Sequence, residues 1–440
     1  MPIPRWKRYV YSTIAAEISS FTRYYDRVVQ WMRQPGDTGF LLEAIEASEK
    51  LDINGDFDLE LSAENDARTA VLLNGTLNCV FDIQSVLLDL RCKLSRTSRV
   101  IAVLYNPYFS FAYRAASRAG IKSGKDVTTF ITHADLSNIA KLAGYEIVRI
   151  RPSVYLPFQL LGLGNLVNRW LPLIPLLRYL AFVAVVVLRP TIARNERPSL
   201  SIIIPARNER GNIQPLLERL PSLETRTEVI LVEGHSADDT WPEIERAVAR
   251  GKPGVTLVAL QQPGIGKNDA VRVGMSRATH EVAVILDADL SVAPEQLAFF
   301  YEAYRTGIGD FVNGSRLVYP MEGEAMRFLN KIANVFFAKA LSATLGVRLT
   351  DSLCGTKLIA LHDVRRIQRW RADFGDFDPF GDFELLFPAA VLCLGIVDVP
   401  IRYRARTYGT TNIQRFRDGL RLLRMTWLAL LRIKTGKVPR

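Results

Sequence analysis

Two aspartates separated by a single residue follow an apolar run, in the sequence Leu286-Asp287-Ala288-Asp289. Alternate residues of an extended segment point to the same side, so the carboxylates of Asp287 and Asp289 can face one site. Two hard oxygen ligands of this kind suit Mg²⁺ or Mn²⁺, which would also bind phosphate oxygens. The pair therefore predicts a divalent-metal site, whereas an isolated Asp-x-Asp is more often a solvated turn or a helix cap.

Polar residues also end other apolar runs in the same half of the chain. The run that begins at Leu200 ends in Pro205-Ala-Arg-Asn208-Glu209, and the next ends at Glu233, whose carboxylate can accept from a base amide or a ribose hydroxyl. Gly266 and Lys267 begin a segment of helical pattern, and the N-terminus of a helix favours an anionic phosphate. These residue types fit a nucleotide diphosphate.

The elements that must position these residues alternate between strands and helices. Such alternation predicts an α/β fold of right-handed βαβ units, with a parallel sheet covered by helices on both faces. Ligands of these sheets bind beyond the carboxyl ends of the strands, which is where the polar residues above lie. We expect strands over residues 200–204, 228–232, 255–259 and 282–286, and helices over 213–220, 243–249 and 267–278.

The C-terminal half resembles the family 2 glycosyltransferases of GT-A fold, and among them the dolichyl- and polyprenyl-phosphate sugar synthases. The resemblance covers about residues 199–413 and implies a Rossmann-like, mostly parallel sheet, an inverting reaction and Mg²⁺ or Mn²⁺ as cofactor. It implies a UDP- or GDP-sugar as donor and a polyprenyl phosphate or a glycan as acceptor. The resembling stretches are Ser201-Ile-Ile-Ile-Pro205-Ala-Arg-Asn208-Glu209, Glu233, Gly266-Lys267, Asp287-Ala-Asp289, Asn313-Gly-Ser-Arg316, Asp351-Ser-Leu-Cys-Gly355-Thr-Lys357 and Gly381-Asp382-Phe-Glu384-Leu-Leu.

The resemblance also implies roles for individual residues. Asp287 would face the donor and share the metal with Asp289, and Asp287 and Asp382 would be the catalytic residues. Asp382 would act as general base on a hydroxyl acceptor, but would only position a phosphate acceptor, which is already ionised. Arg316 and Arg327 would bind the phosphate of the acceptor. The nucleotide pocket would be lined by Pro205, Asn208, Glu209, Glu233, Gly266, Lys267, Asp269, Arg272 and Asp287.

Three residues, in or near these motifs, bear on how far the chain departs from the family pattern. Glu233 stands where the family usually has an aspartate, which leaves the identity of the base open. Ser291 stands where a polar amide is common, so the surroundings of the metal can differ. His235 lies beside Glu233, and we expect it to make a loop contact rather than to act in catalysis.

The basic charge of the chain is concentrated at its C-terminal end. The net charge is +11, and residues 402–440 contain eleven Lys or Arg against one acid, Asp418. A nucleic-acid-binding protein more often spreads a basic face through its fold, so we expect no nucleic-acid partner. The pattern over 415–434 predicts a basic amphipathic helix that lies on an anionic membrane surface or packs on the catalytic domain, and a solvated, disordered tail is the alternative.

Cysteine usage and the apolar segments indicate a compartment. The four cysteines show no CxxC spacing, which fits a reducing environment, and the N-terminus lacks the apolar core of a secretory signal. The apolar block 171–188 is short for a membrane span and contains Arg178, so we expect a buried strand over 179–188, with a partly immersed hairpin as the alternative. We therefore expect a cytoplasmic protein associated peripherally with the inner face of the membrane.

The N-terminal half shows a second α/β pattern, with strands expected over 69–74, 99–105 and 145–150 and helices over 83–94 and 134–143. It resembles the C-terminal part of a class I SAM-dependent methyltransferase, in stretches such as Leu73-Asn-Gly-Thr-Leu77, Val103-Leu-Tyr105-Asn106-Pro107 and Leu142-Ala-Gly144-Tyr-Glu146. A SAM site needs a Gly-rich turn after the first strand, and no GxGxG occurs before Arg68. We expect a degenerate domain that does not turn over SAM.

These patterns together predict the organisation of the chain. We expect a degenerate methyltransferase-like domain over 1–190, a linker over 191–198, a GT-A glycosyltransferase domain over 199–413 and a basic amphipathic helix and tail over 414–440. Three alternatives stay open. The chain could be a bifunctional enzyme that also methylates, or a non-catalytic binding protein with a relic site. Nucleotidylyl transfer is a weaker alternative, because its Gly-rich signature after the first strand is absent.

Overall fold

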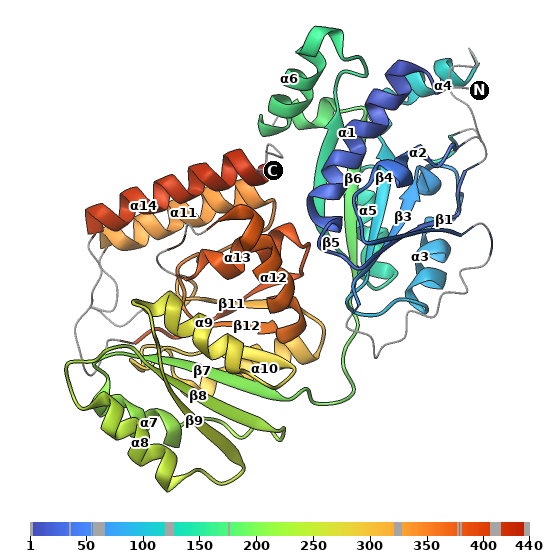
Figure 1. Ribbon diagram of the computed structural model, residues 1–440. Coiled ribbons are helices and arrows are strands. Elements are labelled where there is room, and N and C mark those ends of the chain that lie inside the picture. The colour runs from blue at the N-terminus through green and yellow to red at the C-terminus, as the bar shows by residue number, and fades with distance from the viewer. Residues whose placement is uncertain are drawn as a thin grey trace. The chain divides into compact units, whose positions relative to one another are not determined.

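The computed structural model describes residues 3–34, 37–53, 55, 67–118, 127–174, 177–320, 328–375, 378, 381–404 and 415–434. Contacts divide the chain into two units. The N-terminal unit runs to Ile192, and the C-terminal unit holds Ala193–Ala390 and Leu394–Leu430. Each unit is built on its own sheet with helices packed against it (Figure 1). The predicted α/β class is therefore confirmed for both halves.

The sheet of the N-terminal unit has six strands in the order β2-β1-β3-β4-β6-β5. β1 to β4 pair in parallel, whereas β6 runs antiparallel to both of its neighbours, β4 and β5. The strands are β1 (Arg27–Trp31), β2 (Glu49–Ile53), β3 (Thr69–Asn74), β4 (Arg99–Tyr105), β5 (Tyr145–Val154) and β6 (Val183–Pro190).

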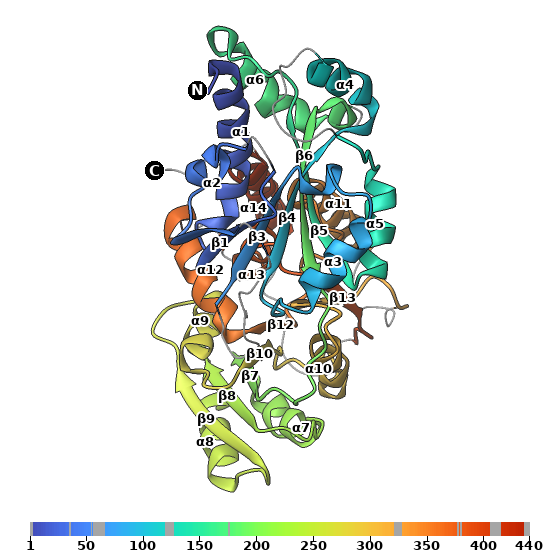
Figure 2. The ribbon, with the colours of Figure 1, turned by 90° about the vertical axis from the view of Figure 1, so that its right-hand side faces the viewer.

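Helices cover both faces of this sheet (Figure 2). α3 and α5 pack on one face, where Leu87 and Leu136 join the apolar core formed by Val71 and Val100. α1 packs against β5 on the other face, and α2 lies beside α1. The helices are α1 (Arg5–Thr22), α2 (Phe40–Ala44), α3 (Ile83–Arg91), α4 (Ser110–Arg118), α5 (His133–Leu142) and α6 (Leu163–Trp170).

The apolar block before the predicted linker is only partly a strand. β6 begins at Val183, and Leu177–Leu180 form a 3-10 turn, so the predicted strand over 179–188 starts four residues too early. β6 is buried along its whole length, as expected of an apolar, β-branched run. Among the residues that the structure describes, no helix is long and apolar enough to cross a membrane.

The sheet of the C-terminal unit has seven strands in the order β13-β11-β12-β10-β7-β8-β9. β10, β7, β8 and β9 are parallel, and β12 runs antiparallel between β10 and β11. The strands are β7 (Leu200–Ala206), β8 (Thr227–Glu233), β9 (Val255–Gln261), β10 (Val282–Ile285), β11 (Phe311–Ser315), β12 (Lys357–Ala360) and β13 (Ile396–Pro400).

The helices of this unit also cover both faces. α7, α8 and α10 share one core with Ile202 and Leu231 of the sheet, and α9 packs on the other face, where Gly274 lies against Ile203. The lack of a side chain at Gly274 allows this close approach. The helices are α7 (Ile213–Glu218), α8 (Thr240–Arg250), α9 (Lys267–Arg277), α10 (Leu297–Arg305), α11 (Phe328–Leu345), α12 (Leu361–Phe374), α13 (Phe383–Val391) and α14 (Arg415–Ala429).

The register of the parallel strands brings their carboxyl ends to one edge of the sheet. Glu233 at the end of β8 pairs with Ala206 of β7 on one side and with Gln261 of β9 on the other. Ile285, the last residue of β10, pairs with Ile203 of β7. The loops that follow these strands therefore meet at the same edge, as the sequence predicts.

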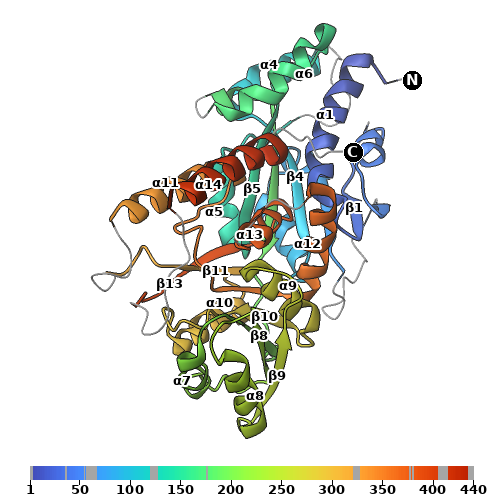
Figure 3. The same ribbon diagram turned by 60° about the vertical axis from the view of Figure 1, so that its left-hand side comes forward.

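The C-terminal helix lies alongside α11 (Figure 3). α14 ends at Ala429, and the predicted helix over 415–434 continues from there as a π-helical turn, Leu430–Lys434. Met425 and Ala429 are buried, whereas Leu420 and Trp427 are exposed. The helix thus has one apolar stripe that packs on the protein and a second that faces solvent.

Candidate active site

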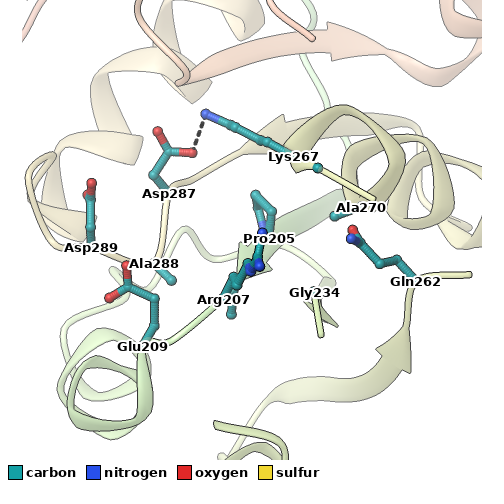
Figure 4. A pocket seen from close by; sticks show the side chains of 12 residues that line it. Pro205, Arg207, Glu209, Gly234, Gln262, Lys267, Ala270, Asp287, Ala288 and Asp289 are labelled. Atoms are coloured by element: carbon teal, nitrogen blue, oxygen red, sulfur yellow. Dashed lines mark ion pairs between the residues drawn. The ribbon is translucent and has the colours of Figure 1, made fainter. Parts of the chain in front are cut away.

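A cavity of about 330 Å³ opens at the carboxyl edge of the C-terminal sheet. It lies where the loops after β7, β8, β9 and β10 meet the N-terminus of α9, and Figure 4 shows the side chains around it. The lining residues are Pro205, Ala206, Arg207, Glu209, Gly234, Gln262, Gly266, Lys267, Ala270, Asp287, Ala288 and Asp289. Six of the residues predicted from the sequence are among them: Pro205, Glu209, Gly266, Lys267, Asp287 and Asp289.

The two aspartates of the predicted metal site both line this cavity. Asp289 is buried, and one of its carboxylate oxygens accepts hydrogen bonds from the backbone amide of Ser291 at 3.0 Å and from its hydroxyl at 2.6 Å. Between them, Leu290 adopts a left-handed conformation with φ of 57°, which turns the chain sharply. Ser291 therefore orients Asp289, a role that the sequence did not reveal.

Lys267 extends from the first turn of α9 to Asp287, with 2.5 Å between its ammonium nitrogen and a carboxylate oxygen (Figure 4). Burial by itself would lower the pKa of Lys267, but the charges of Asp287, Asp382 and Asp289 outweigh it and raise that pKa above its ordinary value. The lysine is therefore held as a cation at a helix N-terminus, where an anionic ligand is favoured.

Gly355 allows a neighbouring loop to approach this ion pair. A side-chain carbon at this position would collide with the ammonium of Lys267 and with a carboxylate oxygen of Asp287. The loop Asp351–Lys357 therefore forms one wall around the pair, and glycine is needed there because of the close approach.

The donor set fits a divalent cation that shares its coordination with a ligand. Among the described residues, no group of three or more His, Cys, Asp or Glu could hold a metal by itself. Asp287 and Asp289 supply two hard carboxylates in one cavity, and Mg²⁺ commonly binds to one or two carboxylates together with substrate phosphates and water. The residues present therefore fit such an ion, provided that Lys267 moves from Asp287.

Asp382, the predicted catalytic carboxylate, forms an ion pair with a buried lysine. Its carboxylate accepts from the ammonium of Lys357 at 2.7 Å, and Lys357 also donates to the carbonyl of Cys354. Asp382 lies close enough to Lys267 to raise the pKa of that lysine, although it does not line the cavity. It therefore belongs to the charged cluster beside the cavity and has a fixed cationic partner.

Three residues that are predicted to contact the nucleotide bind loop backbone in this structure. The carboxylate of Glu233 accepts from the amide of Ser236 at 2.6 Å, because the left-handed His235 folds the chain back on itself. The Asn208 side chain accepts from the amide of Ala237 at 2.7 Å. Asp269 accepts from the amide of Gly264 at 2.8 Å. These side chains hold the loops around the cavity and are absent from its lining. The His235 ring nitrogen lies 2.9 Å from the carbonyl oxygen of Gly264, a loop contact.

Two of the predicted cationic residues form ion pairs away from the cavity lining. Arg272 binds Glu384 through two nitrogens. Arg316 binds the fully buried Asp351 with a bidentate pair of 2.6 and 2.9 Å. Burial disfavours the charged forms of Arg316 and Asp351, but each charge is stabilised more strongly by the other. The pKa of Arg316 is therefore raised and that of Asp351 is lowered. Arg327 lies outside the described residues.

Gln262 and Arg207 line the cavity without having been predicted. Gln262 is buried, its side-chain amide nitrogen donates to the carbonyl of Gly264, and its side-chain oxygen has no hydrogen-bond partner within the described structure. Figure 4 shows this amide turned toward the cavity. A buried acceptor without a partner favours a ligand that donates an N–H group. The available signal is the position of Gln262 three residues after the end of the strand expected over 255–259.

Comparisons with known proteins place this site in a known family of domains. Residues 201–359 match the family model described as Glycosyl transferase family 2. The dolichyl-phosphate hexose transferase of Haloferax volcanii is 29% identical over 224 residues, which is 50% of this chain and 89% of that protein. The undecaprenyl-phosphate 4-deoxy-4-formamido-L-arabinose transferase of Pseudomonas syringae is 28% identical over 35% of this chain and 45% of that protein.

Two further comparisons complete this picture. The dolichol-phosphate mannosyltransferase of Pyrococcus furiosus is 30% identical over 30% of this chain and 37% of that protein. The chain thus spans less than half of two of these three relatives. Among solved structures, glucosyl-3-phosphoglycerate synthase from Mycobacterium tuberculosis, with Mn²⁺, UDP and phosphoglyceric acid, has a TM-score of 0.38 at 18% identity over 55% of this chain and 80% of that one.

The family match and the polar edge define the class of the protein. Residues 201–359 match the family 2 glycosyltransferase model, and the chain is a glycosyltransferase. The match begins in β7 and ends in β12, so it includes Lys267, Asp287, Asp289 and Arg316.

Proposed function

We propose that the protein is a metal-dependent, inverting hexosyltransferase that moves a sugar from a UDP- or GDP-sugar to a polyprenyl phosphate. The observation that carries the proposal is the meeting of Asp287, Asp289 and Lys267 in one cavity of a family 2 domain. The names of the relatives, which include dolichyl-phosphate and undecaprenyl-phosphate transferases, support a polyprenyl-phosphate acceptor.

The residues of the cavity suit a nucleotide-sugar donor. Lys267 would bind the diphosphate, and Asp287 and Asp289 would hold Mg²⁺ or Mn²⁺, which when bound neutralises the charge that develops on the leaving diphosphate. The unpaired side-chain oxygen of Gln262 would accept an N–H group of the base, and both uracil and guanine carry one. The nucleotide-binding roles that the family resemblance implies for Asn208, Glu233, Asp269 and Arg272 remain predictions. The loop and ion-pair contacts of these side chains favour a role in positioning the site.

The ion pair of Asp382 bears on the choice of acceptor. One carboxylate oxygen of Asp382 already accepts from the buried ammonium of Lys357 at 2.7 Å, a contact that suits a positioning role better than proton transfer. An ionised phosphate needs no base: its oxygen forms a bond to the anomeric carbon as the bond to the nucleotide diphosphate breaks, which inverts that carbon. The pair therefore favours a phosphate acceptor over a glycan hydroxyl, with Asp382 and Lys357 positioning it. Arg316 as a phosphate ligand remains a prediction that would require it to part from Asp351.

The C-terminal helix supports an association with the inner face of an anionic membrane. Leu420, Leu423 and Trp427 are exposed on α14, and Arg421 and Arg424 are exposed on the same helix. A helix with this composition lies in the headgroup region of a bilayer, where a polyprenyl phosphate would be presented.

We propose that the N-terminal unit is a degenerate methyltransferase-like domain over 1–190. In this organisation, a linker over 191–198, the GT-A domain over 199–413 and the C-terminal helix and tail over 414–440 follow it. Its mostly parallel sheet, with β6 inserted antiparallel between β4 and β5, is compatible with that family. β1 is followed by Met32 rather than by a glycine, which supports the absence of SAM turnover.

The proposal is tested by nucleotide diphosphate release. Purified protein with Mg²⁺ or Mn²⁺ is mixed with a panel of UDP- and GDP-sugars, with and without a short polyprenyl phosphate. We expect release from one donor that depends on the lipid and is abolished by Asp289→Asn. Release that ignores the lipid would move the acceptor to a glycan, and no release from any donor by folded protein that binds neither UDP nor GDP would refute the proposal.

A further inference from the structure

The N-terminal unit presents a strongly apolar surface around α6 that no part of the proposed reaction uses. The side chain of Leu161 is 109% exposed, and those of its apolar neighbours are about half exposed. We call this the α6 surface. It is formed by Phe158, Leu160, Leu161, Leu163, Leu166 and Trp170. Scattered single apolar residues are normal on a protein surface, but six exposed ones within residues 158–170 indicate an interaction site.

The backbone presents these leucines in a costly conformation. Leu160 and Leu161 both adopt left-handed φ angles, of 38° and 53°, and Gly162 follows with φ of 97°. Two consecutive leucines in this region are strained, because their Cβ atoms crowd the following carbonyls. Leu161 extends into solvent at this turn, and strained residues of this kind cluster at functional sites.

Hydrogen bonds and close packing fix the turn to the rest of the N-terminal unit. The side chain of Asn168 accepts from the amides of Tyr155 and Leu156 at 2.8 and 2.9 Å and donates to the hydroxyl of Tyr9 on α1 at 3.1 Å. Gly164 packs so closely on the carbonyl of Phe158 that a side chain there would collide with it. The apolar tip is therefore part of a fixed structure and not a fraying loop.

The stretches of chain that carry this surface and the helical turns near it hold basic residues and no acid. Figures 2 and 3 show α4, α6 and the first turns of α1 at the same end of the N-terminal unit. The segments 3–16, 106–118 and 155–188 contain no aspartate or glutamate. The exposed basic side chains on α1 and α4 are Arg5, Arg8, Arg114 and Arg118, and Tyr108 and Phe111 add exposed aromatic rings beside α4.

We propose that the α6 surface inserts into the interface of an anionic lipid membrane. Leu161 and Leu163 would enter the acyl boundary, Trp170 would lie at headgroup level, and the arginines of α1 and α4 would meet anionic headgroups. The apolar segment is too short to span a bilayer, so it lies in the interface. Charge of one sign, a protruding apolar tip and an interfacial Trp favour lipid over a protein partner. The proposal does not depend on the glycosyl transfer and is distinct from the contact proposed for α14.

The test is co-sedimentation of the full-length chain with sucrose-loaded vesicles, made of phosphatidylcholine alone or of a mixture with phosphatidylglycerol. We expect wild type to bind the mixed vesicles more tightly, and the L161E/L163E variant to lose roughly tenfold or more in partition coefficient. F81E is the matched control, because Phe81 is 87% exposed on the same unit but lies at the start of α3. It should bind as wild type does.

A second pair of substitutions separates the loss of apolar side chains from the effect of added negative charge. L161S/L163S removes the apolar groups without adding charge, and it should lose binding to a smaller extent while its Tm stays at the wild-type value. Binding by L161E/L163E equal to that of F81E would refute the proposal, because α14 alone would then hold the protein on the vesicles. Absence of wild-type binding would refute it as well. A change of oligomeric state in light scattering, with vesicle binding unchanged, would assign the surface to contact between copies of the chain.

Discussion

The two sheets of this protein share a design but differ at their carboxyl edges. Both place parallel strands between layers of helices, so both form an edge where loops could bind a ligand. In the C-terminal unit, that edge brings Asp287, Asp289 and Lys267 into a cavity of about 330 Å³. In the N-terminal unit, a carboxylate in the loop after β1, that of Asp37, is bound by polar side chains of β1 and β3. Gln30 and Asn74 both donate to the carboxylate of Asp37, each at 2.8 Å.

A cavity does lie at the end of β4 in the N-terminal unit, but its chemistry is different. It measures about 420 Å³, and its lining, which includes Tyr105, Pro107 and Ile131, contains no aspartate, glutamate, lysine or arginine. The strand layout thus supplies an edge, whereas charged side chains at that edge supply the chemistry.

The largest expected effect comes from Asp289→Asn, which removes one metal carboxylate with little change in volume. We expect nucleotide diphosphate release to fall by on the order of 10³-fold, because a bound metal ion contributes several kcal/mol to a transition state of this kind. Asp239→Asn is the matched control, since Asp239 pairs with Arg210 on the surface. Equal activity of the two variants would remove the metal site from the C-terminal edge.

Asp351→Asn tests a buried pair that supports the C-terminal edge from outside the cavity. Removing the partner of Arg316 leaves a poorly exposed charge, and we expect the free energy of unfolding to fall by about 3–5 kcal/mol. The pKa of Asp351 is lowered, so its contribution is present above the unfolded pKa and is lost as the pH falls through the folded pKa. The difference between wild type and variant in urea unfolding should be constant from about pH 5 to 8 and shrink below about pH 4. A difference that grew in acid would contradict this assignment.

Gly355→Ala should disturb the ion pair of Lys267 and Asp287 without touching the core. The added methyl group collides with both side chains, and we expect kcat to fall roughly 10- to 100-fold, as is usual for small displacements of catalytic groups. Gly419→Ala on α14 is the control, because nothing lies within 4 Å of its added carbon. Steady-state kinetics together with thermal melts would show whether the loss is catalytic. Unchanged kcat in the Gly355 variant would mean that the pair is dispensable.

Thermal shift with two kinds of ligand compares the two edges directly. UDP or GDP with Mn²⁺ should raise Tm by a few °C at concentrations of about 100 times Kd, whereas SAM should leave Tm unchanged. A shift with SAM would show that the protein binds SAM, which would contradict the expectation of a degenerate N-terminal domain.

The sequence predicts the C-terminal sheet well because its strands are continuous apolar runs. β7 and β8 were expected over 200–204 and 228–232, and they extend only one or two residues further. The N-terminal strands β1 and β2 lie in a region for which the sequence offered no assignment. β2 has the charged, partly exposed pattern of an edge strand, which lacks a clear apolar signal.

The site was predicted in part, and what was missed has a physical reason. Asp287 and Asp289 could be found because they directly follow an apolar strand and are one residue apart, although the chain turns at Ala288 and Asp289 instead of staying extended as the sequence suggested. The partners of Lys267, Arg316 and Asp382 could not, because each pair joins residues far apart in the sequence that meet only in the folded unit. Glu233 has the expected position, but a left-handed turn at His235 directs its carboxylate to a backbone amide.

The ion pair between Lys267 and Asp287 makes the two expected ligands of the cavity interdependent. While the lysine neutralises Asp287, the local charge that would attract a cation is reduced, and the lysine itself is occupied. A diphosphate that draws Lys267 away restores that charge and so increases the affinity for a cation. By thermodynamic reciprocity, the cation increases the affinity for the diphosphate by the same factor. Nucleotide and metal should therefore bind cooperatively as one unit, and the resting enzyme should discriminate against either one arriving alone.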